Sequence, residues 1–176
     1  MDKVASTAAG VEPGWRTAGR FLLSSVILQL IYACGEGSAA ETLLVESATV
    51  ASAAWFISLL DPHIAVLAVG REIIAPCGTL SILNGCDGSE TLLLLAAAII
   101  AAPVSRGWRL VGLLASLPFV YVINQIRLVA LFFSYCFARN NFAFLHGYAA
   151  PSAIVLACSL FFLAWLQLSQ IRTHAR

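Results

Sequence analysis

NGCDGSE, residues 84–90, separates a turn-rich and partly polar segment from a long apolar run that suits lipid. Asp87 and Glu90 have the spacing of a capping box, which predicts that a helix starts at Gly88 and leaves Cys86 just outside its first turn. Free backbone N–H groups and the helix dipole favour an anion there, so they would promote the thiolate of Cys86. The charge of Asp87 opposes this effect. The alternative is that Cys86 is a small residue packed in a loop.

The composition of the 176-residue chain is that of an integral membrane protein. Hydrophobic residues make up 60% of the sequence and charged residues 11%, whereas ordinary soluble domains have about 25% charged residues. We therefore predict an all-α polytopic membrane protein. The length leaves room for one module of a few spans, which we assign to residues 1–176 as a single domain. The net charge of +1 carries no information about partners.

Four apolar segments are predicted to cross the membrane, at about residues 18–35, 88–105, 109–137 and 148–170. The first segment could instead be a cleaved signal peptide. It lacks a clean small-x-small cleavage site, so we favour a retained span. The second segment is short for a hydrocarbon core of about 30 Å, which places Cys86 at the membrane surface or slightly below it.

Residues 36–87, between the first two spans, are predicted to remain on one side of the membrane. Within them, residues 43–60 are apolar enough to be mistaken for a further span. Glu46, Thr49 and Ser52 recur at three-residue spacing, however, and such a polar stripe suits a helix that lies at the interface. A short β-hairpin or meander is predicted to follow, because turn signals separate short alternating segments. Such backbone must lie outside the hydrocarbon or be covered by protein.

The distribution of Lys and Arg predicts the orientation of the spans. Seven cations fall on one side of the four-span arrangement, namely Lys3, Arg16, Arg20, Arg106, Arg109, Arg172 and Arg176. Only Arg71 and Arg139 fall on the other side. The positive-inside rule therefore places both termini in the cytoplasm and Cys86 on the outer face. A fifth span at residues 43–60 would place Arg106 and Arg109 outside, so we reject it.

Polar residues within or beside the last two spans could meet Cys86 at the outer face. Asn124 and Arg127 are three residues apart, so they share one face of a helix. An arginine in a span costs about 2.5–3.5 kcal/mol on insertion scales and usually faces a protein interior or a watery cavity; the alternative is that Arg127 snorkels to the surface. His146 lies in the predicted outer loop before the last span. A thiol and an imidazole are the minimum set for an activated cysteine nucleophile, and a guanidinium can stabilise the thiolate or an oxyanion.

Three motifs in this order resemble the exosortase/archaeosortase family of membrane-embedded cysteine transpeptidases: Asn84-Gly-Cys86-Asp-Gly, Asn124-Gln-Ile-Arg127 and His146-Gly147. The resemblance covers about residues 60–155 and is greatest to short variants that contain the catalytic module with few further spans. It implies catalytic roles for Cys86, Arg127 and His146, and supporting roles for Asn124, Asp87 and Asn84, with no metal and no cofactor. Many members have a small hydroxyl residue where Asp87 stands and about twice as many spans.

The resemblance also implies a reaction, a location and partners. The substrate would be an exported protein with a C-terminal sorting signal, made of a short motif, an apolar helix and a basic tail. Cys86 would form a thioester, His146 would protonate the leaving amine and then activate the acceptor, and Arg127 would stabilise negative charge. The acceptor could be water, a lipid or a glycan, no nucleic acid is involved, and the location would be the cytoplasmic membrane of a prokaryote.

The main alternative is a non-enzymatic membrane protein, either a transporter component or an accessory of polysaccharide export, in which Arg127 and Asn124 bind an anionic lipid or substrate. Three further cysteines are expected to pack as small hydrophobic residues, namely Cys34, Cys136 and Cys158. Cys77 is predicted to face outward, and a Cys77–Cys86 disulfide is an alternative that would disable the nucleophile. A metal site is not predicted, because no compact ligand spacing is present.

Overall fold

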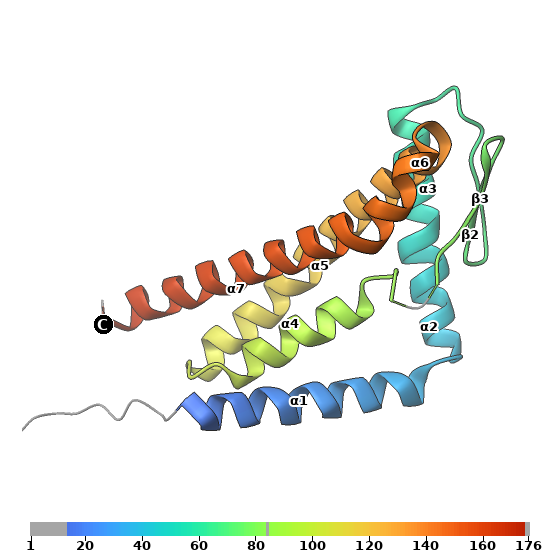
Figure 1. The fold of residues 1–176 in the computed structure, drawn as a ribbon. Coiled ribbons are helices and arrows are strands. Elements are labelled where there is room, and N and C mark those ends of the chain that lie inside the picture. Colours follow the sequence, from blue (N-terminus) through green and yellow to red (C-terminus); the bar gives the residue numbers. More distant parts are fainter. Residues whose placement is uncertain (1–13, 84, 175–176) are drawn as a thin grey trace, which may run out of the picture.

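Helices dominate the computed structural model, which describes residues 14–83 and 85–174 (Figure 1). The bundle contains α1 (Gly14–Gly35), α4 (Ser89–Ala101), α5 (Arg106–Phe137) and α7 (Ala150–His174). Within the described residues, three helical stretches are long and apolar enough to cross a membrane, namely Gly14–Gly35, Arg106–Phe137 and Arg139–Ile171. The predicted all-α membrane fold is therefore confirmed. The fourth apolar helix, α4, has 13 residues and a length of about 20 Å, so it is short, as predicted.

A second helical element runs across one end of the bundle. It consists of α2 (Ala39–Leu43), η1 (Leu44–Ala51) and α3 (Ser52–Leu60), of which η1 is a π-helix, and Figure 1 shows it crossing the direction of the long helices. Its buried side chains, which include Val50 and Ile57, pack against Leu128 and Phe132 of α5. This placement suits the predicted interfacial helix.

The polar stripe of this crossing helix differs from the expectation. Thr49 is only 8% exposed, and the carboxamide Nε2 of Gln125 in α5 donates to the carbonyl oxygens of Ala48 and Thr49, at 3.3 and 3.4 Å. The expected stripe assumed α-helical spacing, whereas Glu46 and Thr49 lie in the π-helix η1, which has a wider turn. The polar side chain of Thr49 therefore belongs to a helix–helix contact and not to an exposed surface.

The predicted meander is confirmed as a three-stranded antiparallel sheet. Its strands are β1 (Leu67–Val69), β2 (Glu72–Ala75) and β3 (Gly78–Ser81), in the spatial order β1-β2-β3. Gly70, with φ of 55°, makes the first turn in a conformation that other residues rarely adopt. Ile73 is fully buried and joins the same apolar core as the crossing helix, so the sheet closes over the end of the bundle.

A disulfide joins the second turn of the sheet to α5. Cys77 is bonded to Cys136, with 5.3 Å between their Cα atoms, and not to Cys86. The expectation that Cys136 packs as a free small residue was therefore wrong, as was the alternative pairing of Cys77 with Cys86. The turn can approach α5 this closely because Gly78 has no side chain. A Cβ atom there would lie 2.7 Å from the hydroxyl oxygen of Tyr135.

The segment before the last span is helical, which corrects the prediction of a loop. α6 (Arg139–Phe144), the π-helix η2 (Leu145–Ala149) and α7 follow one another without a break. Pro151 lies inside this continuous helical segment. Proline has no N–H to donate to the preceding turn, and the chain passes that point through the wider turn of η2. His146 therefore projects from a helical surface.

The contact between α5 and α7 at the opposite end generates a prediction. A Cβ atom on Gly112 would lie 2.6 Å from the indole ring of Trp165, whose Nε1 donates to the carbonyl oxygen of Trp108 at 3.2 Å. We expect Gly112→Ala to lower the free energy of unfolding by about 1–3 kcal/mol through overpacking. Gly107→Ala in the same helix is the control, because nothing lies within 4 Å of its Cβ position. Thermal unfolding in detergent would measure both. Equal midpoints for the two variants would contradict this packing.

Candidate active site

Cys86 lies on a tight turn between β3 and α4. Its backbone N–H donates to the carbonyl oxygen of Leu83 at 3.0 Å. Gly85 and Gly88 both have positive φ, of 84° and 88°, which explains why glycines flank the cysteine. The Cys86 side chain is half-buried against the core formed by the crossing helix, the sheet and α5. The turn therefore presents one free thiol at the end of the bundle.

The predicted capping box is wrong. Gly88 is the N-cap residue of α4, the helix begins at Ser89, and no side chain caps it. Because Asp87 precedes the N-cap, its carboxylate instead accepts hydrogen bonds from the Ser89 hydroxyl and, at 3.4 Å, from the Tyr32 hydroxyl of α1. These two hydrogen bonds connect the Asp87 carboxylate to α1 and to the first residue of α4.

Arg127 of α5 reaches the turn that carries Cys86. Its guanidinium donates to the carbonyl oxygen of Gly85 at 3.4 Å and to the Cys86 sulfur at 3.8 Å. Within residues 14–83 and 85–174, no ion pair of Arg127 with a carboxylate is found, and its buried Nε has no hydrogen-bond partner. An unneutralised positive charge beside a thiol favours the thiolate. The guanidinium of Arg127 is thus directed at the turn.

His146 of η2 also reaches Cys86. Its Nε2 lies 3.6 Å from the Cys86 sulfur, and its ring stacks on the ring of Phe142, one turn earlier, with centroids 5.6 Å apart. The wide turn of η2 carries the imidazole, which remains exposed. The structure therefore brings Cys86, Arg127 and His146 together from three separate elements, with the sulfur in contact with both nitrogen-bearing groups.

Asn124 lies under the same turn, one helical turn before Arg127. It is 3% exposed, and neither atom of its carboxamide has a hydrogen-bond partner among the described residues. A Cβ atom on Gly88 would lie 3.0 Å from Asn124 Cγ, so Asn124 requires a glycine at the N-cap of α4. Asn84, the remaining predicted supporting residue, lies outside the described residues.

Sequence reasoning missed three groups that support the site: Tyr32, Gly88 as the N-cap, and Phe142. The four-residue spacing of Phe142 and His146 was a usable signal, since residues i and i+4 of a helix meet, but it required the segment to be read as a helix. Tyr32 is 55 residues from Asp87, and no local pattern connects them. No group of three or more His, Cys, Asp or Glu side chains is placed to hold a metal ion in the part of the chain that the structure describes.

A thiol in contact with both a guanidinium and an imidazole is suited to nucleophilic catalysis. The imidazole can take the thiol proton and return it to a leaving group, while the guanidinium stabilises the negative charge on sulfur or on an oxyanion. A groove of about 380 Å³ adjoins the site, and Arg127 lines it together with apolar residues of α5, η2 and α7. The site is therefore next to a surface that can receive an apolar molecule.

Comparison with known proteins gives one match. The family model described as transmembrane exosortase (Exosortase_EpsH) matches residues 7–169, which is nearly the whole chain. No curated protein and no solved structure matches the chain.

The contact between Arg127 and Cys86 predicts the reactivity of the thiol. In a Cys34→Ser, Cys158→Ser background, Cys86 is the one remaining free cysteine. We expect Arg127→Gln to slow its alkylation by iodoacetamide about tenfold, because one charge-assisted hydrogen bond to the thiolate is lost. Arg139→Gln is the matched control, since that guanidinium lies over the Tyr135 ring, 4.4 Å from its centroid. An unchanged rate in Arg127→Gln would show that the guanidinium does not activate the sulfur.

Proposed function

The chain belongs to the transmembrane exosortase family, and from this premise we propose that it is a cysteine protease and transpeptidase that removes C-terminal sorting signals from exported proteins. The family consists in general of cysteine peptidases and transpeptidases. The observation that carries the proposal for this chain is the contact of the Cys86 sulfur with both His146 Nε2 and Arg127 Nη2, at 3.6 and 3.8 Å.

The first half of the reaction forms a thioester. His146 Nε2 accepts the proton of the Cys86 thiol, and the sulfur attacks the carbonyl carbon of the scissile peptide bond. Arg127 stabilises the thiolate before the attack and lies close enough to the sulfur to stabilise the oxyanion that forms next to it. The tetrahedral intermediate collapses when His146 returns the proton to the leaving amine. The C-terminal part of the signal then departs, and the rest of the substrate is held on Cys86.

The second half releases the substrate. An acceptor that carries a hydroxyl or amine gives its proton to His146 and attacks the thioester carbonyl, which restores the Cys86 thiol. If the acceptor is water, the protein acts as a protease; if it is a lipid or a glycan, it acts as a transpeptidase. His146 is exposed, so an acceptor can approach it from outside the bundle.

The apolar helix of the sorting signal has a suitable place beside the site. The groove that Arg127 lines is formed by α5 on one side and by η2 and α7 on the other. Ala149, Ala153 and Ala157 follow one another at four-residue spacing along it, and Ala130 faces them from α5. Small residues on a membrane helix let another helix approach closely. We propose that the signal helix packs here, with the peptide bond to be cleaved next to Cys86.

The disulfide supports an outward orientation of the site. Cys77 belongs to the sheet that covers the Cys86 end of the bundle, and Cys77 and Cys136 are bonded. Disulfides form and persist in oxidising compartments and are rare in the cytoplasm. This agrees with the excess of Lys and Arg on the other side. We therefore propose that the site faces outward from the cytoplasmic membrane of a prokaryote, with both termini inside.

The non-enzymatic alternative finds less support in the geometry. It requires Arg127 and Asn124 to bind an anionic lipid or substrate together. Asn124 is buried beneath Gly88, however, and the guanidinium of Arg127 is directed at Gly85 and Cys86. A binding site for a headgroup would not need the contact of an imidazole with a free thiol.

Processing of a substrate tests the proposed roles. We expect Cys86→Ala to leave a co-expressed substrate uncleaved and Arg127→Lys to accumulate normally but lose processing, because an ammonium lacks the planar fork that bonds Gly85 and Cys86 together. Adding Arg127→Lys to Cys86→Ala should cost nothing more, because residues that act as one unit are not additive. Gel mobility of the substrate reports cleavage. Cys158→Ala is the control and should process normally. Processing of the substrate by Cys86→Ala at the wild-type rate would contradict the proposal.

Reporter fusions test the orientation. A fusion after Arg106 should report the cytoplasm, and a fusion after Gly78, in the sheet, should report the exterior, because the positive charges gather at the α4–α5 turn and the disulfide lies at the sheet. A cytoplasmic signal at Gly78 would remove the outward site.

A further inference from the structure

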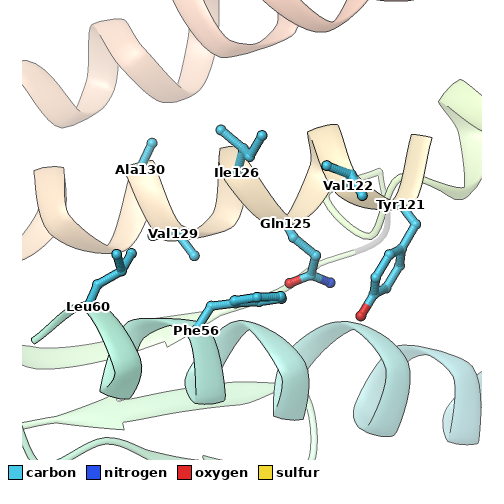
Figure 2. A pocket seen from close by; sticks show the side chains of 8 residues that line it. All are labelled: Phe56, Leu60, Tyr121, Val122, Gln125, Ile126, Val129 and Ala130. Carbon is cyan, nitrogen blue, oxygen red and sulfur yellow. The ribbon is translucent and has the colours of Figure 1, made fainter. Parts of the chain in front are cut away.

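A second apolar pocket, of about 390 Å³, lies between α3 and α5 (Figure 2). Phe56 and Leu60 of α3 form one wall, and Val122, Gln125 and Val129 of α5 are among the residues of the other. The pocket is distinct from the groove beside Arg127. Ile126 and Ala130 border both, but Gln125 and Arg127 are two residues apart, which turns a helix by about 200°, so these two side chains leave α5 on nearly opposite faces.

One buried polar atom in this apolar wall lacks a partner. Gln125 is 4% exposed, and its Nε2 donates to the carbonyl oxygens of Ala48 and Thr49 in η1, which fixes the orientation of the carboxamide. Its Oε1 accepts no hydrogen bond from any residue that the structure describes. Figure 2 shows the carboxamide extending from α5 toward α3, with the Phe56 ring beside its oxygen. A buried acceptor without a donor is costly and calls for an explanation.

We infer that this pocket binds a membrane lipid that carries an O–H or N–H donor next to its apolar chain. The chain would fill the space between Phe56 and Val129, and the donor would bond Gln125 Oε1 after a rotation of the Phe56 ring. The crossing helix supplies one wall, so the pocket lies near the end of the bundle where α2, η1 and α3 run across it (Figure 1). If this helix lies at the interface, polar donors of lipids are found at the same depth.

The lining and setting of the pocket favour a lipid chain over a second polypeptide helix. Its walls carry large side chains such as Phe56, Leu60 and Tyr121, and Ala130 is the one small residue that lines it, whereas close packing of a second helix needs small residues. The groove proposed for the signal helix is lined by five alanines, so the two sites differ in their lining and not in their size. A group the size of a water molecule or a methylene takes up about 30 Å³. The pocket of about 390 Å³ therefore has room for roughly a dozen such groups, which is the scale of one acyl chain. Val122 and Ile126, at its edge, are exposed apolar side chains where lipid can enter.

Two probes that differ in one hydrogen-bond donor test the inference. The first is a long-chain fatty alcohol that carries a photoactivatable diazirine, and the second is its methyl ether. Each probe is incorporated into vesicles with the full-length protein. We expect the alcohol to label the walls of the α3–α5 pocket about threefold to tenfold more than the ether does, because the alcohol can donate one hydrogen bond that the ether cannot. Peptide mapping by mass spectrometry locates the label. Equal labelling by the two probes, or labelling spread evenly over the apolar surface, would overturn the inference.

Variants with a filled pocket provide the second arm. Val122→Trp should remove the labelling at the α3–α5 pocket, because the indole occupies the space that Val122 borders. Val111→Trp is the matched control, since Val111 is exposed to the same degree on the same helix, 50% against 52%, and should leave the labelling unchanged. Persistent pocket labelling in a folded Val122→Trp protein would contradict the inference. Displacement of the alcohol by an apolar peptide helix, and not by unlabelled alcohol, would assign the pocket to a polypeptide and would also contradict it.

Discussion

The arrangement depends on one interaction: the guanidinium of Arg127, on a membrane-spanning helix, bonds the turn between β3 and α4. A charge in such a helix needs partners, because the hydrocarbon offers none. The carbonyl oxygen of Gly85 and the sulfur of Cys86 are those partners, at 3.4 and 3.8 Å. The contact ties the turn to α5 and places a positive charge beside the thiol. One contact thus both stabilises the arginine in the membrane helix and activates the cysteine.

The remaining elements make this contact possible by covering the end of the bundle. The crossing helix and the sheet share one apolar core with α5, in which Val50, Ile57, Ile73 and Phe132 are fully buried. The Cys77–Cys136 disulfide adds a covalent link between the sheet and the same helix. Because irregular backbone is tolerated near lipid only where protein covers it, this cap is what allows a glycine-rich turn to sit there.

Much of this fold could be predicted from the sequence, because lipid imposes simple rules. The lengths of the apolar segments predicted the spans, and glycine and proline residues predicted the turns of the sheet. The cost of a charge in lipid identified Arg127 as a candidate site residue. Expectations failed where a distant residue or a π-helical turn decides the local structure. Thr49 is buried, and Gln125 of α5 donates to its carbonyl oxygen, whereas an exposed stripe was expected. Asp87 bonds Tyr32 rather than capping α4, Cys77 pairs with a cysteine 59 residues away, and His146 lies in a helix that continues through Pro151 by way of a π-helical turn. The convergence of Cys86, Arg127 and His146 was predicted, but their contacts depend on these details.

The proposed reaction passes through a covalent thioester on Cys86, so the most direct measurement is the intact mass of the protein during turnover. Purified protein would be mixed with a substrate that carries a C-terminal sorting signal and quenched in acid. We predict an adduct on Cys86 with the mass of the N-terminal part of the substrate. Hydroxylamine should remove this adduct, and Cys86→Ala should not form it. Cleavage of the substrate with no adduct on Cys86, and with Cys86→Ala equally active, would contradict the proposed reaction.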